Sequence, residues 1–307
     1  MHDLIIIGGG PAGVAAGVYA SRKRLKTAFI TDSFGGQSIV SEDIQNWIGT
    51  ISISGQALAE SLKKHLEAYA GDIVSIHEGE KVARVEKKDS NFVVTTQNGG
   101  SYEAKTVLVT TGSHRRKLDI PGAEEFENKG ITYCATCDGP LFSDKDVVVI
   151  GGGNAGFETA AQLLAYTKSV TLLQRGPQYR ADPVTVDRVL KNEKMTGITN
   201  TELIKITGDT FVTGLTYKDN NTGKEVALKT DGIFVEIGLI PTTGFVKDIL
   251  TLDKWGHIIT DPRTQRASVT GIWAAGDCTD ALYHQNNIAA GDAVKALEDI
   301  YLFLHTK

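Results

Sequence analysis

Two stretches of the chain share one pattern of apolar, glycine and alanine positions. Residues 4–13 read LIIIGGGPAG, and residues 147–156 read VVVIGGGNAG. An unbroken apolar run of this kind is typical of a strand buried on both faces of a parallel sheet. The alanine-rich segments that follow, Val14–Arg22 and Phe157–Tyr166, predict helices, and each leads into a further short apolar run. The pattern therefore predicts a strand–helix–strand unit in each half of the chain.

Each unit has a G-x-G-x-x-G motif between its strand and its helix. In dinucleotide-binding folds the first glycine permits a tight turn, the second lets the backbone approach a pyrophosphate, and the third lets the helix pack against the strand. The free N–H groups at the start of the helix then meet the phosphates. One such motif is a weak signal, but two copies in the same context predict two dinucleotide sites. The glycines are Gly8, Gly10 and Gly13 in the first copy and Gly151, Gly153 and Gly156 in the second.

The residue that reads the ribose is expected about 20 positions after the glycines, where the second strand ends. Asp32 stands there in the first copy and Arg175 in the second. An acid suits a free ribose hydroxyl and a base suits a 2′-phosphate, so the first site favours FAD or NAD and the second favours NADPH. Each residue is equally compatible with a solvated charge at a strand end.

Three further apolar runs end in glycine or Gly-Asp, at residues 106–112, 232–238 and 269–277. The first two add one strand to each unit, whereas the third has no partner unless the chain returns to the first unit. We therefore predict an α/β protein with two Rossmann-like dinucleotide-binding domains, the second inserted into the first. The predicted domains are an FAD-binding domain at 1–115 and 247–307 and a nicotinamide-nucleotide-binding domain at 116–246.

Other periodic segments complete the two domains. Lys81–Thr96 and Ile204–Tyr217 alternate apolar and polar residues, as half-exposed antiparallel strands do. Gln285–Leu304 has helical periodicity, so it predicts a helix with one apolar face. The residues of that face are Ile288, Ala289, Ala293, Ala296, Leu297 and Ile300.

The composition excludes several classes of protein. The chain has 307 residues, of which 41% are hydrophobic and 22% are charged, enough apolar material for two cores. A net charge of −5 gives no support to a nucleic-acid partner or a polybasic membrane anchor. No run approaches the roughly 20 apolar residues of a membrane span, and the start, MHDLIIIGGG, lacks the features of a signal peptide. We therefore expect a cytoplasmic protein with neither a nucleic-acid nor a membrane partner.

The chain has three cysteines, and two of them, Cys134 and Cys137, form a C-x-x-C motif. A zinc site would need two more ligands, but Cys278 is distant and no second such motif exists, so we predict no metal site. A C-x-x-C pair instead lowers the pKa of one thiol and forms a reversible disulfide. Asp138 follows directly and could exchange protons with the thiols. Because Gly and Pro come next, Asp138 is also a good turn residue, and both interpretations stay open.

Over essentially its full length the chain resembles the low-molecular-weight thioredoxin reductases. The order and spacing of the motifs and the inserted second domain agree with that family. The matching stretches are GGGPAG (8–13), FGGQ (34–37), IQNW (44–47), TTG (110–112), YCATCDG (133–139), GGGNAG (151–156) and AAGD (274–277).

The resemblance implies two cofactors, FAD in the first domain and NAD(P)H in the second. Asp277 would lie near the ribityl and pyrophosphate region of FAD, and Gln285 and Asn286 would close over the flavin. The implied FAD residues are Gly8, Gly10, Pro11, Ala12, Gly13, Asp32, Gly36, Gln37, Asn46, Val82, Thr111, Gly112, Gly276, Asp277, Gln285 and Asn286. The implied NAD(P)H residues are Gly151, Gly153, Asn154, Ala155, Gly156, Glu158, Arg175 and Arg180.

The resemblance also implies a role for each residue of the cysteine motif. Cys137 would face the flavin, Cys134 would attack a protein disulfide, and Asp138 would be the acid–base group. Electrons would pass from NAD(P)H through FAD and the cysteine pair to thioredoxin or a thioredoxin-like protein. Because the disulfide and the nicotinamide site share the inserted domain, we expect that domain to rotate about hinges near 113–117 and 241–247. A homodimer is likewise expected from the family.

Departures from the family pattern leave the electron donor open. NADPH-dependent members have a His-Arg-Arg run and a further Arg four residues on, whereas this chain has Gln174-Arg175-Gly176 and Arg180. The second domain also resembles the flavoprotein component of alkyl hydroperoxide reductases, which favours NADH and serves a peroxiredoxin system. A ferredoxin-linked relative has lost its nicotinamide site, but the second glycine motif of this chain is intact. A redox-sensing flavoprotein is the non-enzymatic alternative, although the chain has no recognisable partner-binding appendage.

Overall fold

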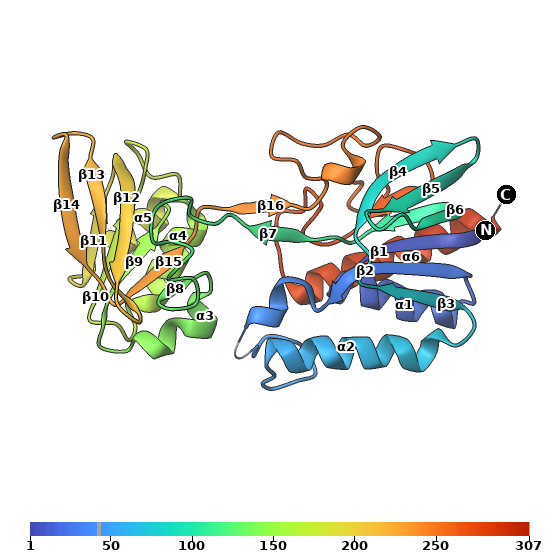
Figure 1. The fold of residues 1–307 in the computed structure, drawn as a ribbon, viewed down its shortest axis with the longest axis horizontal. Helices are drawn as coiled ribbons and strands as arrows, with labels where there is room; N and C mark the ends of the chain where they lie inside the picture. Colours follow the sequence, from blue (N-terminus) through green and yellow to red (C-terminus); the bar gives the residue numbers. More distant parts are fainter. Residues whose placement is uncertain (42–43, 307) are drawn as a thin grey trace. The chain divides into compact units, whose positions relative to one another are not determined.

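The computed structural model describes residues 1–41 and 44–306, without the side chains of Val40, Thr136 and Cys137. The chain forms two compact units, and each is described by itself (Figure 1). The first unit comprises residues 1–114 and 240–307, and the second comprises residues 115–239. The second unit is thus continuous in sequence and interrupts the first.

The first unit is built on a seven-stranded sheet in which β1, β2, β3, β6 and β17 pair in parallel. The pairing of β17 with β6 shows that the run expected to return to the first unit does so. In pairing order the strands are β3 (Val74–Glu78), β2 (Thr27–Phe34), β1 (His2–Gly9), β6 (Ser101–Val109), β5 (Asn91–Thr96) and β4 (Val82–Lys88), with β17 (Ile272–Ala274) also on β6. The helices are α1 (Pro11–Arg22), α2 (Gly55–Ala70) and α6 (Asn286–His305), and η1 (Gly36–Val40) and η3 (Gly244–Val246) are short 3₁₀ turns.

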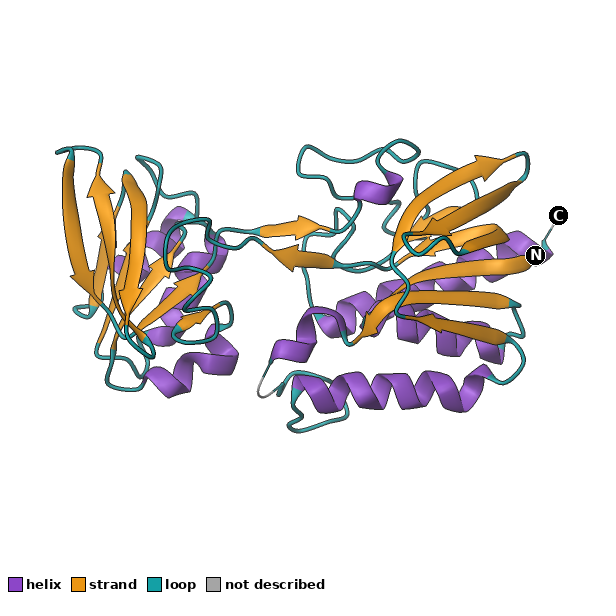
Figure 2. Ribbon diagram, viewed as in Figure 1, coloured by secondary structure: helices purple, strands orange, loops and turns teal. Residues whose placement is uncertain are grey.

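Strand β1 explains why this sheet is covered on both faces. Leu4 and Ile6 pack into a core with α1, α2 and α6, whereas Ile5 and Ile7 pack into a second core on the opposite face. The three helices therefore cover one face, and the β4–β5 ribbon and residues 246–258 cover the other (Figure 2). On α6 all the expected apolar residues are buried except Ile288, whose side chain is 37% exposed.

The second unit repeats this arrangement on a smaller scale. Val147 and Val149 of its central strand face a core that contains α4 and α5, and Val148 and Ile150 face a three-stranded antiparallel sheet. The parallel sheet runs β11 (Met195–Ile198), β10 (Ser169–Leu173), β9 (Asp146–Ile150), β15 (Gly232–Val235) and β8 (Ile131–Thr132). The antiparallel sheet is β12 (Thr201–Gly208), β13 (Val212–Asp219) and β14 (Lys224–Lys229). The helices are α3 (Ala135–Asp138), α4 (Asn154–Leu163), α5 (Pro183–Leu190) and the 3₁₀ turn η2 (Gly139–Phe142). The predicted α/β class with two Rossmann-like sheets is confirmed.

The two connecting segments, β7 (Ser113–Arg115) and β16 (Leu239–Pro241), pair with each other. Residues 240–246, which we expected in the inserted domain, belong instead to the first unit. The backbone N–H of Thr242 donates to the carbonyl of Gly112 at 3.0 Å, and the Val246 side chain is fully buried in the first unit's core. The glycine and threonine residues of this segment are typical of a loop. Its apolar residues have no regular spacing that would predict packing against either domain. None of the described helices combines the length and the apolar character that a membrane crossing requires.

Candidate functional site

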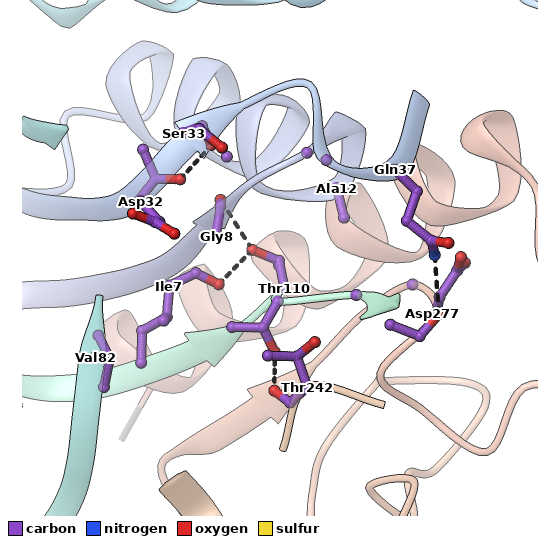
Figure 3. Close-up of a pocket in the computed structure, with 18 of the residues that line it drawn as sticks. Ile7, Gly8, Ala12, Asp32, Ser33, Gln37, Val82, Thr110, Thr242 and Asp277 are labelled. Carbon is purple, nitrogen blue, oxygen red and sulfur yellow. Dashed lines mark hydrogen bonds between the residues drawn. The ribbon is translucent and has the colours of Figure 1, made fainter. Parts of the chain in front are cut away.

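A cavity of about 560 Å³ opens in the first unit where β1, β2 and β6 end (Figure 3). The carboxyl ends of parallel strands meet at this edge of the sheet, which is where such folds bind ligands. Segments far apart in sequence meet here, because the lining is formed by residues 7–12, 30–33, 36–38, 80–83, 97, 110–113, 242, 244–245, 275–277, 286 and 289.

The glycine turn gives this cavity a floor of bare backbone. Gly8 has a φ of +118°, which side chains rarely adopt, and its turn leads directly into α1. A Cβ at Gly13 would lie 1.8 Å from the carbonyl oxygen of Gly8, so only glycine lets α1 approach the strand this closely. A Cβ at Gly10 would meet nothing closer than 4.0 Å, so this backbone is open to a ligand.

Acidic side chains mark both ends of the cavity. Asp32, at the end of β2, is exposed and lies toward the same end as Val82, whereas Gln37 and Asp277 lie toward the other (Figure 3). Burial raises the pKa of Asp277, and the nearby His284 and His257 oppose that rise. No N–H or O–H of the described residues donates to its carboxylate, so Asp277 is an acceptor without a donor.

Most of the FAD residues implied by the sequence line this cavity, but Gly13, Asn46 and Gln285 do not. Gly13 lies behind the turn, and Asn46 and Gln285 are exposed and hydrogen-bond each other, with Nδ2 of Asn46 3.1 Å from Oε1 of Gln285. The lining residues are Gly8, Gly10, Pro11, Ala12, Asp32, Gly36, Gln37, Val82, Thr111, Gly112, Gly276, Asp277 and Asn286.

Several lining residues had not been expected from the sequence. Thr110 directly follows β6, and its hydroxyl donates to the Ile7 carbonyl at 2.8 Å, which ties the end of β6 to the strand before the glycine turn. Its place in the TTG motif was the signal that could have identified it. Thr242 and Phe245 come from the segment expected in the other domain, and the Thr111 hydroxyl donates to the Thr242 carbonyl at 2.7 Å.

The cavity residues fit FAD. The glycine turn offers backbone N–H groups at the start of a helix to a pyrophosphate. Asp32 offers a carboxylate to ribose hydroxyls, and Asp277 offers a second acceptor for hydroxyl donors at the far end. An FAD molecule carries hydroxyl groups on both sides of its pyrophosphate, which matches two acceptors on either side of one glycine turn.

The second unit has a glycine turn of the same geometry. Gly151 has a φ of +119°, and a Cβ at Gly156 would lie 1.9 Å from the Gly151 carbonyl oxygen. Gly153 has open space where a Cβ would stand, so the backbone is again accessible. Of the other implied residues here, Asn154 accepts a hydrogen bond from the Asp182 backbone N–H at 2.8 Å, and Glu158 is exposed at the start of α4. Ala155 follows Asn154 in the first turn of this helix, and it too is exposed.

The cations at this second turn are free for a ligand, but Gln174 is not. Oε1 of the buried Gln174 accepts from the Gly152 N–H at 3.0 Å, and its Nε2 donates to the Gln178 carbonyl at 3.0 Å. Arg175 and Arg180 are both exposed, and neither forms an ion pair with any residue that the structure describes. Two unpaired guanidinium groups at this edge suit a phosphate group.

The sequence pattern did not predict Glu236, whose carboxyl lies beside the second glycine turn. Glu236 follows β15, and a Cβ at Gly151 would lie 2.2 Å from its carbonyl oxygen. The Thr159 hydroxyl donates to its Oε1 at 2.8 Å. Burial raises the pKa of Glu236, although the hydrogen bond from Thr159 and the charge of Arg115 oppose it. The residue stands where the apolar run 232–238 predicted only a strand end.

The cysteine motif lies between β8 and η2 in the second unit. Cys134 is half-buried and disulfide-bonded, and the side chain of Cys137 lies outside the described residues. The Thr132 hydroxyl donates to the carboxylate of Asp138, and the Asp138 N–H donates to the Cys134 carbonyl at 3.0 Å. The Tyr166 hydroxyl donates to the Ala135 carbonyl at 3.3 Å and holds the segment from the far end of α4.

Asp138 does not cap the turn that follows it. It precedes η2, but its side chain makes no capping hydrogen bond there. The carboxylate is directed to Thr132 instead, which favours the acid–base interpretation over the turn interpretation. Sequence patterns gave no signal for Thr132.

The third thiol belongs to the core of the first unit. Cys278 is free and fully buried, and burial raises its pKa to about 11. Among residues 1–41 and 44–306, no three His, Cys, Asp or Glu side chains are grouped so that they could hold a metal ion.

Comparison with known proteins gives a consistent set of relatives. The family model described as pyridine nucleotide-disulphide oxidoreductase matches residues 2–293. The chain is 40% identical over 294 residues to a protein named NADH dehydrogenase from Bacillus subtilis, and 40% identical over 295 residues to the F component of the alkyl hydroperoxide reductase of Staphylococcus aureus. Each match covers 96% of this chain but only 57% of the relative.

A solved structure matches over nearly the full length of both chains. The thioredoxin reductase of Streptococcus pyogenes is 36% identical, with a TM-score of 0.83 over 100% of this chain and 99% of that one. The fold of this chain thus has a counterpart of nearly the same length.

Proposed function

Because this chain belongs to the pyridine nucleotide-disulphide oxidoreductase family, whose members use FAD and NAD(P)H, we propose that it is a thioredoxin-disulfide reductase. FAD would bind in the first unit, NAD(P)H at the second glycine turn, and the protein substrate would be thioredoxin or a thioredoxin-like protein. The observation that carries the proposal is the disulfide-bonded Cys134 beside an oriented acid, Asp138, in a chain with two open glycine turns.

FAD, when bound, supplies the two-electron chemistry that links a nicotinamide nucleotide to the disulfide. The residues that would hold it are the first glycine turn, Asp32, Gln37 and Asp277, all of which line one cavity. The second turn, with Arg175 and Arg180, would hold the nicotinamide nucleotide.

The reduced cysteine pair would pass its electrons on by thiol–disulfide exchange. The Cys134 thiolate attacks one sulfur of the substrate disulfide, so a mixed disulfide forms and the other substrate sulfur leaves as a thiolate. The Cys137 thiolate then attacks the sulfur of Cys134, which restores the disulfide of the motif and releases the second substrate thiolate. Two electrons move to the substrate, and each released thiolate takes up one proton.

Asp138 is the proposed proton donor and acceptor for these thiols. Its carboxylate is held by the Thr132 hydroxyl, and its backbone N–H is bonded to Cys134 itself. A fixed acid next to the pair can supply a proton to a departing thiolate and remove one from an attacking thiol.

The layout of the chain implies a movement between its units. The second glycine turn and the cysteine motif both belong to residues 115–239, whereas the proposed FAD site belongs to the other unit. Because each has to reach the flavin in turn, we propose that the units rotate about β7 and β16. A non-thiol crosslink that clamps the two units should stop turnover, and unchanged turnover would contradict the rotation.

A second candidate function is reduction of a peroxiredoxin system with NADH. It is favoured by the 40% identity to the F component of an alkyl hydroperoxide reductase, although the chain spans little more than half of that relative. Separate assays with thioredoxin and with a peroxiredoxin, each with NADH and with NADPH, distinguish the two functions. If neither nucleotide bleaches the flavin, the ferredoxin-linked alternative is favoured.

The central experiment replaces Cys134. The Cys134→Ser variant should lose all reduction of thioredoxin, while NAD(P)H still bleaches its flavin, because only the attacking thiol is gone. Cys278→Ser is the matched control, since that thiol is buried in the other unit and should keep full activity. Full activity in Cys134→Ser would show that the assignment is wrong. Sedimentation of the purified chain would test the proposed homodimer.

A further inference from the structure

A buried glutamine joins the second glycine turn to the segment that carries Arg180. Gln174 directly follows β10, and its side chain is buried in the second unit. Its Oε1 accepts a hydrogen bond from the Gly152 N–H at 3.0 Å, and its Nε2 donates to the Gln178 carbonyl at 3.0 Å. One side-chain amide therefore bridges the turn and the residues just before Arg180.

Two further hydrogen bonds hold the same segment against the turn. The Arg180 N–H donates to the Gly152 carbonyl at 2.7 Å, and the Asp182 N–H donates to Oδ1 of Asn154 at 2.8 Å. A Cβ at Gly152 would lie 2.9 Å from the ring of Tyr179, so the turn and this segment are in close contact. The main chain of Arg180 is thus fixed beside the turn, while its side chain is exposed to a ligand.

The first unit shows what the amide of Gln174 adds. Thr31 stands at the corresponding position, the same number of residues after the glycine motif, and its hydroxyl donates to the carbonyl of Ser33, two residues further on. The longer side chain of Gln174 reaches a carbonyl four residues further on, that of Gln178. The bridge therefore fixes a longer loop, and that loop ends at a cation.

The side-chain groups left free at this strand end are donors. Where such a fold takes a nucleotide with an unmodified ribose, an acid at the strand end accepts from the 2′-hydroxyl. Here the acceptor oxygen of Gln174 is already bonded to Gly152, and a guanidinium group has no acceptor at all. In the described part of the chain neither Arg175 nor Arg180 is paired with an acid, and both are exposed. This chemistry suits a phosphate better than a free hydroxyl.

We propose that Gln174 selects the electron donor, because its amide holds the Arg180 segment on the glycine turn so that Arg180 meets the 2′-phosphate of NADPH. Gln174 is a positioning residue, since it acts through Arg180. The inference rests on the proposed function and deepens it by assigning NADPH as the donor.

Loss of the bridge should therefore affect the two nucleotides unequally. Without the bond to Gln178, the loop before Arg180 gains freedom that it has to give up again when a phosphate binds. NADH has no 2′-phosphate, so the position of Arg180 hardly matters to it. Damage to the glycine turn itself would instead weaken both nucleotides alike, because both carry the pyrophosphate.

The experiment measures kcat/KM of the flavin-loaded chain with NADPH and with NADH and compares their ratio. Wild type should prefer NADPH. Gln174→Met keeps the length of the side chain, removes both hydrogen bonds and adds no charge, so it should lower the ratio by about tenfold, mainly through KM for NADPH. Gln174→Glu keeps the acceptor for Gly152 and loses only the donor to Gln178, so it should lower the ratio as well even where the Met variant folds poorly.

A double-mutant cycle tests whether Gln174 acts through Arg180. Arg180→Gln should lower the ratio by itself, and adding Gln174→Met to that variant should change the ratio no further. Gln265→Met is the matched control, because Gln265 is a buried glutamine of the first unit whose amide donates to Asp292 at 3.2 Å. It should keep the wild-type ratio even if it lowers stability.

The outcomes distinguish this inference from the proposed function. A wild-type chain that uses NADH as well as NADPH, or Gln174 variants that keep the wild-type ratio, would overturn the role of Gln174 and leave a nicotinamide-dependent reductase. Two effects that multiply in the double variant would show that Gln174 does not act through Arg180. A flavin that neither nucleotide bleaches would overturn the nicotinamide-dependent function and this inference together.

Discussion

The two glycine turns of this chain have nearly the same backbone. Gly8 and Gly151 have φ values of +118° and +119°. Gly13 and Gly156 are packed so closely on the preceding turn that a Cβ would lie 1.8 Å and 1.9 Å from a carbonyl oxygen. Both turns follow a strand whose side chains are buried on alternate faces, and both begin a helix.

The difference lies in the side chains at the neighbouring strand ends. The first turn has Asp32 near the end of β2 and the uncharged Thr110 after β6, whereas the second has Arg175 after β10 and the carboxyl of Glu236 after β15. The backbone of both turns suits a pyrophosphate, and we propose that the strand-end side chains decide which dinucleotide each turn accepts.

The largest effects are expected when the two glycine turns are disrupted one at a time, which tests whether they bind different dinucleotides. Gly156→Val should lower flavin reduction by NAD(P)H by about 100-fold or more while FAD stays bound, because displacement of the helix disturbs only the second site. Gly13→Val should instead give a chain that is purified without flavin. Flavin absorbance and stopped-flow bleaching measure the two effects. If both variants lose FAD, the sites are not independent as proposed.

The next largest effect is expected from the arginines at the second turn, and it tests whether they select NADPH over NADH as the electron donor. If the second turn takes NADPH, replacing either Arg175 or Arg180 with Gln should lower kcat/KM for NADPH by roughly 10- to 100-fold, since one lost hydrogen bond to a charged group is worth about 1.5–3 kcal/mol. The value for NADH should hardly change. Arg188→Gln, an exposed arginine on α5, is the control. Equal losses with both nucleotides would show that the arginines do not read a 2′-phosphate.

The same comparison shows what the sequence could predict and what it could not. The glycine motifs and the apolar runs predicted both sheets and the return of the chain to β6, because local periodicity and turn geometry determine those features. Residues 240–246 were placed in the wrong domain, because their packing depends on Gly112 and on a core formed by distant strands. Thr132 and Thr159 gave no signal, since each matters only through a partner that folding brings next to it.

A smaller effect is expected from Glu236, whose counterpart after β6 in the first unit is the uncharged Thr110. Because burial raises its pKa, the folded chain binds its proton more tightly than the unfolded chain, and this stabilisation is lost as pH rises through the folded pKa. Glu236→Gln keeps an acceptor for Thr159 and removes the charge. Its Tm should match wild type near pH 4 and exceed it by a few degrees near pH 7.5. A Tm difference that does not change with pH would contradict a buried charge.

The smallest effect should come from Cys278, the free and buried thiol of the first unit. Its sulfur donates to the carbonyls of Val109 at 3.6 Å and Ala275 at 3.4 Å, and its pKa is raised to about 11, so little of the reactive thiolate exists near neutral pH. Cys278→Ala should cost about 1 kcal/mol in urea unfolding and leave kcat/KM unchanged. In the wild-type chain, a maleimide should label the Cys278 thiol only after the protein has been unfolded. If the variant folds normally but loses activity, Cys278 takes part in the reaction, and its assignment as a purely structural residue is wrong.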